Sequence, residues 1–564
     1  MPMTGLNKAA ELMRAGHPGP ALAQIDAVLR TGPAPATTAR CWSMKGVIAR
    51  LSGDGAEARR CQIRALAIAP ALDDAATELA RLFNAGGQPV EAIRCTRDAA
   101  AAARPSQALL VERARAWQAL DRAEERVAER RRIAVLYPGK AATHHNLASA
   151  LGDAGHAAEA EAQARKAIAL GGPAPETRLV LARALQSQTR FDEAEAAFVT
   201  ALTLRPGYFD ALRDLAQLAW MRGDGIDAVL ARIETHAAGM PRSTVAMLQS
   251  SFLASAGMPR EGYAALLAAI DRGDPQAQAA AAALALPFDA AAALVHARQG
   301  AALAPTSQAV RRVLADALLA SHEASAALAL VEEMLSRAPL DQGLVAARWT
   351  AWRLLEDPRA AELYDYARVV RSIAIAAPQG WSDREAYLAD LRQALHRLHR
   401  FDAHPLDQSL RGGSQTASNL LLSHDPALKA LPEALAPAIE TYLHGLGTGT
   451  DVLRARLGKG RRFAGMWSVR LRPGGRHLPH VHPQGWISSA LHVDLPENSG
   501  GEREGWLEFG RPGVPDLEAQ LHVQPAAGNL VLFPSCMWHS TVAFTGQGYR
   551  TSIAFDIVPA LPGA

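Results

Sequence analysis

Residues 181–206, LARALQSQTRFDEAEAAFVTALTLRP, set the fold of the larger part of this chain. Ala, Leu, Arg and Glu dominate and β-branched runs are scarce, which favours two helices joined by a short turn. Small side chains such as Ala182 and Ala201 let two antiparallel helices approach closely, and Phe198 is expected to fill the space between them. Pro206 cannot continue a helix, because proline lacks a backbone N–H and its ring clashes with the preceding turn. The stretch therefore predicts a helical hairpin.

The same hairpin recurs through the first 378 residues with a nearly constant period. The residues that end successive units lie 30 to 35 positions apart. They are Pro70, Pro105, Pro138, Gly172, Pro206, Pro241, Pro275, Pro305 and Pro339. A period of about 34 residues with a terminal proline is the signature of tetratricopeptide repeats, and residues 1–378 resemble that family as about ten helical hairpins.

This resemblance implies an all-α tetratricopeptide superhelix over residues 1–378. A single hairpin cannot bury its apolar face alone, so neighbouring hairpins stack and share one continuous core. The concave face of such a solenoid usually binds an extended peptide or a partner protein. A spacer or a dimerisation arm is the alternative use.

The chain changes character after Pro378. Residues 381–398 and 432–446 read as amphipathic helices. Between them, residues 404–416 are rich in Gly and polar side chains and are expected to form an ordered loop. From Phe463 onward, strands are expected. They are residues 466–471, 486–495, 506–509, 530–533 and 551–558. Short strands separated by Gly and Pro turns favour a sandwich or jelly roll.

Three histidines and an arginine in this region form the skeleton of a mononuclear iron site. Non-haem Fe(II) takes about three protein ligands on one face and leaves positions open for a cosubstrate and dioxygen. His480 and His482 have the spacing that puts two strand residues on the same side, and His539 is expected from a facing strand. Arg550 suits the far carboxylate of a dicarboxylate cosubstrate, because a guanidinium makes two parallel, charge-assisted hydrogen bonds. Ser552, two residues on, faces the same way and can add a hydroxyl.

The order of motifs in this region resembles the 2-oxoglutarate and Fe(II)-dependent oxygenases, in particular the bacterial branch that follows tetratricopeptide repeats. The motifs are residues 406–413, 467–471, 480–488, 507–510, 533–535, 538–539 and 550–556. The resemblance implies a double-stranded β-helix (jelly-roll) domain with flanking helices over residues 379–564. It also implies Fe(II) held by His480, His482 and His539, and 2-oxoglutarate as cosubstrate held by Arg550 and Ser552.

The ligand pattern departs from the common set of two histidines and one carboxylate, and two alignments stay open. In the first, His482 takes the carboxylate place, which gives a three-histidine set. In the second, the chain resembles the aspartyl/asparaginyl hydroxylases, which use two histidines and no carboxylate. There His482 is the first ligand, Gln484 takes the carboxylate place, and His492 lies near the cosubstrate. His539 is a ligand in both, and Asp494 is too far along its strand to replace the carboxylate.

Two functional classes follow from these features. In the first, the chain is an oxygenase that hydroxylates a protein or peptide substrate recruited by the repeats. In the second, it is a non-catalytic tetratricopeptide scaffold with a degenerate oxygenase domain. Consumption of 2-oxoglutarate in the presence of Fe(II) and oxygen separates the two.

Composition and the N-terminal sequence bear on the kinds of partner and the cellular compartment to be expected. Hydrophobic residues make up 49% of the chain and charged residues 20%, with a net charge of +3. Arg and Glu alternate along helical faces instead of gathering on one side, so no nucleic-acid partner is expected. The N-terminus lacks a basic segment followed by an apolar core, and no uncharged apolar run is long enough to span a bilayer. The sequence therefore predicts a cytoplasmic protein that does not bind membranes.

Overall fold

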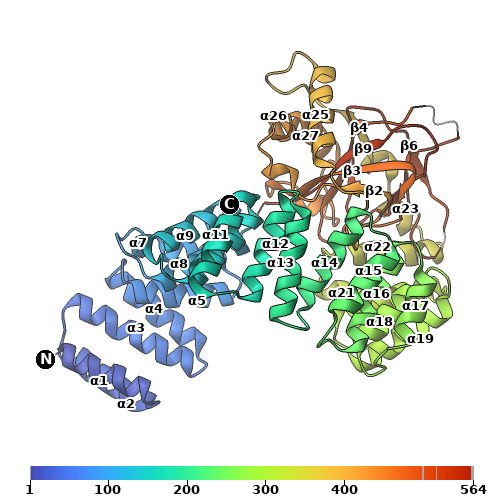
Figure 1. Ribbon diagram of the computed structural model, residues 1–564. Coiled ribbons are helices and arrows are strands. Elements are labelled where there is room, and N and C mark those ends of the chain that lie inside the picture. The colour runs from blue at the N-terminus through green and yellow to red at the C-terminus, as the bar shows by residue number, and fades with distance from the viewer. Residues whose placement is uncertain (1, 498–500, 516, 561–564) are drawn as a thin grey trace. The chain divides into compact units, whose positions relative to one another are not determined.

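The computed structural model describes residues 2–497, 501–515 and 517–560 (Figure 1). The described chain forms two compact units, residues 2–188 and 189–560. The first unit is entirely helical. The second contains further helices and all of the described strands.

The first unit consists of helices that pair along the chain. They are α1 (Pro2–Arg14), α2 (Pro18–Arg30), α3 (Pro35–Leu51), α4 (Gly55–Ile68), α5 (Asp73–Ala85), α6 (Pro89–Cys95), α7 (Arg97–Ala100), α8 (Gln107–Ala119), α9 (Ala123–Leu136), α10 (Ala141–Asp153), α11 (Ala157–Gly171) and α12 (Pro175–Ser187). Each hairpin buries mostly alanine and leucine, as Ala160, Ala164 and Ala167 of α11 illustrate. Side chains this small let adjacent helices pack closely, as the sequence predicts.

The second unit begins with further repeat helices. They are α13 (Phe191–Leu204), α14 (Phe209–Arg222), α15 (Ile226–His236), α16 (Arg242–Ser255), α17 (Pro259–Leu267), α18 (Pro275–Ala285), α19 (Ala290–Leu303), α20 (Gln308–Ala320), α21 (Ala324–Arg337), α22 (Gln342–Leu354), α23 (Arg359–Leu363) and α24 (Tyr366–Val369). Pro206, Pro305 and Pro339 each come two residues after the second helix of a hairpin, as expected. Pro275 is instead the first residue of α18. A backbone N–H at that position would make no hydrogen bond within the helix, so proline is tolerated there.

The remainder of the second unit is built on β-strands. They are β1 (Arg371–Ala374), β2 (Leu410–Gln415), β3 (Arg461–His477), β4 (Ile487–Asp494), β5 (Leu507–Phe509), β6 (Leu521–Val523), β7 (Asn529–Pro534), β8 (His539–Thr541) and β9 (Arg550–Pro559). The larger sheet is antiparallel with the order β1-β7-β4-β9-β3-β2, and the smaller one has the order β6-β5-β8. Short helices flank them, namely α26 (Pro426–Lys429) and the 3-10 turns Leu420–Leu422 and Arg454–Arg456.

Alternation along β9 separates the core of this β domain from a cavity. Ile553, Phe555 and Ile557 are buried in the same hydrophobic cluster as residues of α25 (Arg384–Leu398) and α27 (Leu431–Gly445). Burial of each such side chain away from water contributes roughly 1.5–3 kcal/mol to the free energy of folding. The intervening residues Arg550, Ser552, Ala554 and Asp556 line a cavity that residues of both sheets enclose. The predicted class, helical repeats followed by a β-sandwich domain with flanking helices, is confirmed.

The strand β1 lies within the region that the sequence assigns to helices. Residues Arg371–Ala374 pair with Leu532–Asn529 of β7 and so form an edge of the larger sheet. A four-residue strand of this kind is too short to show an alternating pattern. The domain limits expected from the sequence, 1–378 and 379–564, remain a prediction, but backbone pairing joins β1 to the β domain.

The prediction of a loop at residues 404–416 is wrong for the second half of this segment, which forms β2 beside β3. Glycine allows this pairing, since a Cβ added at Gly413 would lie 2.4 Å from the carbonyl oxygen of Arg470. Gly412 has a φ of +69°, at the point where the register shifts between Arg411 and Gly413. Gly-rich edge strands with a bulge lack the apolar alternation by which strands are recognised.

Helix α14 holds one loop of the β domain. Trp220 donates its indole N–H to the carbonyl of His404 at 2.8 Å. The carbonyl of Met221 accepts the backbone N–H groups of Asp402 and Ala403 at 2.8 and 3.1 Å. These bonds fix the segment that leads into residues 407–409, which line the cavity.

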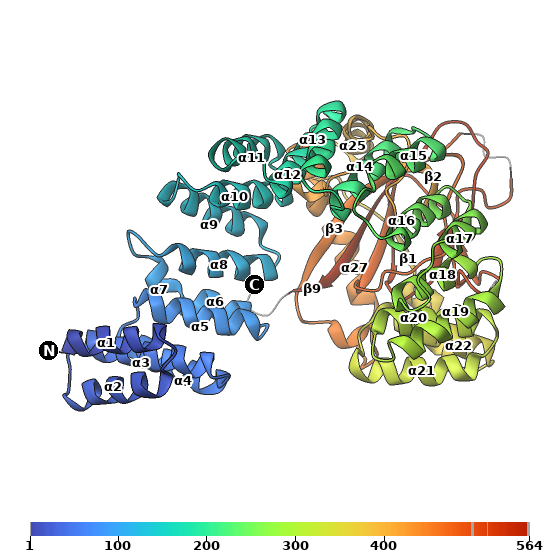
Figure 2. The same cartoon turned by 60° about the horizontal axis from the view of Figure 1, so that its bottom comes forward.

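Helix α22, at the other end of this run of repeats, holds two more segments of the β domain. The backbone N–H of Gln342 donates to the carbonyl of Pro483 at 3.0 Å. The indole N–H of Trp538 donates to Thr350 at 3.0 Å. In Figure 2, the helices from α14 to α22 follow one another around one side of the sheet. The repeats of the second unit therefore contact the β domain at both ends of this arc.

Among the described residues, no helix combines the length and the apolar character needed to cross a bilayer.

Replacing the buried Thr350 by valine should lower the free energy of unfolding of the second unit by about 1–3 kcal/mol, because the partly buried indole N–H of Trp538 loses its acceptor. The matched control is Thr441→Val, on an exposed face of α27. The Thr441 hydroxyl donates to the carbonyl four residues earlier, at 2.8 Å, but it accepts no hydrogen bond from an indole such as that of Trp538. Urea unfolding followed by tryptophan fluorescence measures the difference, and equal effects of the two substitutions would contradict the predicted contact.

Candidate metal centre

Backbone hydrogen bonds bring the three histidines together. His480 and His539 form an antiparallel bridge, with N–H to O=C distances of 3.0 and 3.1 Å. The backbone N–H of His482 donates to the carbonyl of Ser535 at 3.0 Å. The segment before β4 is thereby tied to the segment before β8. The rings of His480 and His539 lie 4.1 Å apart between centroids, and His482 lies 5.2 Å from His539.

One nitrogen from each ring lies within 4.8 Å of the other two. The second nitrogens already have partners. Nδ1 of His480 lies 2.8 Å from the carbonyl of Leu478, and Nδ1 of His539 lies 3.0 Å from the carbonyl of Met537. A carbonyl can only accept, so both Nδ1 atoms carry the proton and both Nε2 atoms keep their lone pairs.

The third ring is oriented by a carboxylate. Nδ1 of His482 lies 2.7 and 2.8 Å from the two oxygens of Asp556. Asp556 also accepts a hydrogen bond from Ser488 at 2.7 Å. This pairing of a histidine with a carboxylate is the usual way in which proteins fix the tautomer and orientation of a metal-binding imidazole. With each Nδ1 engaged in this way, the Nε2 atoms of the three rings are the candidate metal-binding atoms.

Burial keeps the rings of His480 and His539 uncharged. It lowers the pKa of His480 to about 3, and the nearby charge of His482 adds to the effect. It also lowers the pKa of His539 well below its usual range, with smaller contributions from His480 and His482. A histidine must be neutral to bind a metal, so no proton has to be displaced from these two rings near neutral pH.

The three histidines lie in a cavity of about 530 Å³ that also contains Arg550. The Arg550 side chain is 1% exposed, and its Nε donates to the carbonyl of Gly505 at 3.0 Å. Its Nη2 has no hydrogen-bond partner within the described chain. Burial lowers the pKa of Arg550 to about 10, which leaves the guanidinium charged at neutral pH. A buried, unpaired charge is costly, so the site suits an anionic ligand.

Ser552 and His492 lie near this guanidinium. Ser552 lines the cavity, and His492 is directly opposite it in the register between β4 and β9, so the two side chains share a face. His492 is fully buried, and neither ring nitrogen has a hydrogen-bond partner in the part of the chain that the structure describes. Burial lowers its pKa far below the usual range, and the charge of Arg550 lowers it further.

The structure thus brings His480, His482 and His539 together and sets Arg550 and Ser552 in the same cavity. The expectation that His480 and His482 lie on a regular strand is wrong, since only an isolated bridge at His480 interrupts the loop between β3 and β4.

The residues of the second alignment fall in different places. Gln484 lines the cavity, whereas His492 lies beside it without lining it. Asp494 forms an ion pair with Arg392 of α25 at 3.2 Å and is absent from the cavity lining.

Two residues of the site were missed in the sequence. Asp556 orients His482, and Ser409 lies 2.9 Å from Nδ1 of His477 and 3.2 Å from Nε2 of His480. Period-two counting from Arg550 along β9 would have put Asp556 on the cavity face. Ser409 belongs to the motif 406–413, but nothing in its spacing indicates that the loop folds back to the histidines.

Comparison with known proteins agrees with this location. The model of a family described as "Putative 2OG-Fe(II) oxygenase" matches residues 465–556. The matched stretch includes the three histidines, Asp556 and Arg550. The resemblance expected for this region is confirmed. No curated protein matches the chain.

Solved structures similar to this chain include tetratricopeptide repeat proteins. One is YrrB, described as a TPR protein with an unusual peptide-binding site, with 13% identity over 31% of this chain and 91% of that chain and a TM-score of 0.30. Another is a tetratricopeptide repeat protein from Parabacteroides merdae ATCC 43184, with 15% identity over 49% of this chain and 97% of that chain and a TM-score of 0.35.

Asp556→Asn should weaken metal binding by about 10–100-fold, the usual effect of losing a partner that orients a ligand. Asp390→Asn is the matched control, because Asp390 is an exposed carboxylate that accepts a hydrogen bond from Trp381 at 2.9 Å. Anaerobic titration with Fe(II), followed calorimetrically, gives both affinities. An Asp556 variant that binds metal as tightly as the control would rule out the orienting role.

Proposed function

We propose that the chain is an Fe(II)- and 2-oxoglutarate-dependent oxygenase that hydroxylates a protein or peptide. The observation that carries the proposal is the grouping of three imidazole nitrogens in a cavity with a buried guanidinium whose Nη2 has no hydrogen-bond partner among the described residues. Fe(II) and 2-oxoglutarate, when bound, supply the oxidising chemistry, in which dioxygen is consumed, the cosubstrate becomes succinate and a C–H bond of the acceptor is hydroxylated.

His480, His482 and His539 would hold the metal through Nε2. Imidazole ligands suit iron but also zinc, copper and nickel, so the three rings alone do not select iron. The match of residues 465–556 to an oxygenase family and the unpaired guanidinium support iron with an anionic cosubstrate.

Arg550 and Ser552 would bind the far carboxylate of 2-oxoglutarate. A buried guanidinium offers two parallel N–H groups in the geometry of a carboxylate, and burial strengthens the attraction. His492, with both ring nitrogens unpartnered, is a further group that can contact the cosubstrate. These residues would bind and orient the dicarboxylate.

The acceptor would be a polypeptide held by the repeats. Stacked helical hairpins offer extended concave surfaces of the kind that bind peptides and proteins. The second unit supports this role, because α14 and α22 are bonded to segments that line or flank the cavity. The repeats of the second unit and the cavity thus belong to one compact unit.

The direct test is anaerobic binding of Fe(II) and 2-oxoglutarate, followed by oxygen-dependent release of succinate. Wild-type protein should bind both, and His539→Ala should lose metal binding by about 100-fold or more, because a ligand whose Nε2 faces the metal is removed. His522→Ala is the control, since His522 lies on β6 of the same small sheet outside the cavity.

Each outcome of this test has a distinct meaning. Succinate from the wild type and from His522→Ala, but not from His539→Ala, would support the oxygenase. Zinc binding without 2-oxoglutarate binding would contradict it. Binding of neither metal nor 2-oxoglutarate would favour a scaffold with a degenerate domain.

Arg550→Met should reduce the affinity for 2-oxoglutarate by about 100-fold or more, because two charge-assisted hydrogen bonds contribute roughly 1.5–3 kcal/mol each. Metal affinity should stay within about twofold, since Arg550 acts on the cosubstrate and not on the metal. Without ligand, the variant should be as stable as the wild type or more stable, because an uncompensated buried charge is removed. Arg392→Met, on the exposed face of α25, is the control. Loss of stability in ligand-free Arg550→Met would contradict this view of the residue.

A further inference from the structure

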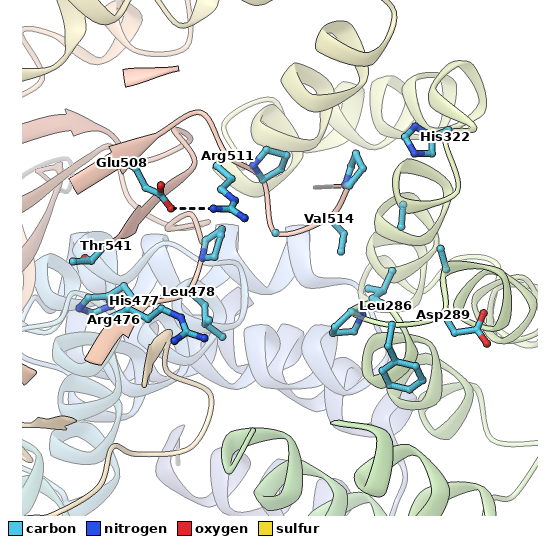
Figure 3. A pocket seen from close by; sticks show the side chains of 18 residues that line it. Leu286, Asp289, His322, Arg476, His477, Leu478, Glu508, Arg511, Val514 and Thr541 are labelled. Carbon is cyan, nitrogen blue, oxygen red and sulfur yellow. Dashed lines mark ion pairs between the residues drawn. The ribbon is translucent and has the colours of Figure 1, made fainter. Parts of the chain in front are cut away.

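A second pocket adjoins the candidate metal centre within the second unit. It has a volume of about 610 Å³. Repeat residues form one wall, mainly Leu286–Ala290 between α18 and α19 and the end of α20. The β domain forms the other wall, from Arg476–Pro479 at the end of β3 and Arg511–Pro515 after β5 (Figure 3).

The pocket and the metal-centre cavity share a wall. His477 and Thr541 line both of them. His477 stacks on His480 at 5.7 Å between ring centroids. The hydroxyl of Thr541 is buried and has no hydrogen-bond partner within the described residues. A ligand in the second pocket therefore lies one side chain away from the proposed metal ligands, beside a hydroxyl that is free to bond to it.

Part of the pocket wall is apolar, and several of its residues lack a backbone N–H donor. Leu286, Phe288, Leu478 and Val514 supply apolar surface. Four further positions are prolines, namely Pro287, Pro479, Pro512 and Pro515. Proline has a carbonyl acceptor but no N–H, so these walls suit a ligand that brings its own N–H donors. A polypeptide backbone is such a ligand.

The charges around the pocket are mixed. Asp289 stands on the repeat wall and Arg476 on the opposite wall, as Figure 3 shows. Glu508 and Arg511, on the β-domain side, lie 3.8 Å apart as an ion pair. Opposite charges on facing walls give no net attraction for a strongly acidic or strongly basic ligand. The chemistry fits an uncharged, extended segment with an apolar side chain.

Size also favours a chain over a compact molecule. Each of the two cavities is large enough for a small-molecule ligand, within the usual range of about 300–1,000 Å³. A ligand that reaches from the repeat wall to the metal centre must occupy both and must be elongated. An extended polypeptide, which advances roughly 3.3 Å per residue, meets that requirement.

We propose that this pocket holds the part of a polypeptide substrate that flanks the oxidised residue, with an apolar side chain against Leu286, Phe288 and Val514. The inference rests on the proposed oxygenase function and names its substrate class. It assigns α18–α20 a direct part in recognition, so that the repeats form one wall of the substrate site as well as a recruiting surface.

The test fills the pocket from either wall. Ala320→Trp adds bulk at the end of α20, and Gly513→Tyr adds it from the β-domain side, where a new Cβ meets only the carbonyl oxygen of Pro479 at 3.7 Å. The matched controls are Ala119→Trp, at the exposed end of α8, and Gly139→Tyr, at an exposed glycine with no atom within 4 Å of its added Cβ. The pocket is filled from opposite walls by two separate substitutions, so that the test still stands if one of the two variants does not fold.

The probe is a pool of capped random peptides of about nine residues, which span roughly 30 Å when extended. Full-length protein is loaded anaerobically with Fe(II) and 2-oxoglutarate, and retained peptides are identified by mass spectrometry. Wild type and both controls should retain peptides enriched in an apolar residue at one position. Both fillers should lose that retention by about tenfold or more, equal to about 1.4 kcal/mol.

Hydrogen exchange with a selected peptide should slow in residues 286–290 and 511–515 of the wild type. Retention unaffected by the fillers, absence of enrichment on the wild type, or protection confined to other repeats would each overturn the inference. Fe(II) and 2-oxoglutarate binding, measured on the same samples, separates the two hypotheses. Binding of both ligands with peptides that ignore the pocket defeats this inference alone, whereas binding of neither defeats the proposed function.

Discussion

The candidate site depends on one antiparallel bridge, in which His480 and His539 exchange two backbone hydrogen bonds. The bridge ties a loop of one sheet to the first residue of a strand in the other. The main chain sets the two residues opposite each other. Each Nδ1 then donates to a carbonyl two residues away, and these bonds orient the rings. Two rings of the candidate metal centre are thereby held by hydrogen bonds within the protein.

Hydrogen bonds from the repeats of the second unit hold the segments on either side of the bridge. Loops between strands are the mobile part of most β domains, yet here the segments around the site are bonded to helices. Pro483, next to His482, accepts a hydrogen bond from Gln342, and Trp538, next to His539, donates one to Thr350. Tyr364 donates to the carbonyl of Cys536 in the same segment. Helices of the second unit therefore hold the loops that present the histidines.

The sequence predicts the local features of this protein better than the long-range ones. The repeat period needs only small residues and prolines at fixed spacing. The five expected strands overlap β3, β4, β5, β7 and β9, because apolar runs mark them, whereas β1, β2, β6 and β8 were not predicted. The pairing of Thr350 with Trp538 joins residues 188 positions apart and has no local signal. Asp556 has the right spacing from Arg550, but its role depends on how β9 is aligned with the loop at His482. Strand β2 was not predicted, because the glycines that allow its close pairing with β3 remove the alternation of apolar and polar side chains.

The position of Asp556 gives a physical meaning to the missing carboxylate ligand. In the common iron site a carboxylate contacts the metal and removes one unit of its charge. In the three-histidine alignment the corresponding position holds His482, and a carboxylate lies one imidazole further out, on the opposite ring nitrogen. A negative charge at Nδ1 raises the basicity of Nε2 and would still stabilise a cation across the ring. The site would thus keep its negative charge while offering a metal three nitrogen ligands. Among the described residues, Nη2 of the nearby Arg550 has no hydrogen-bond partner, which leaves its charge available for a dicarboxylate.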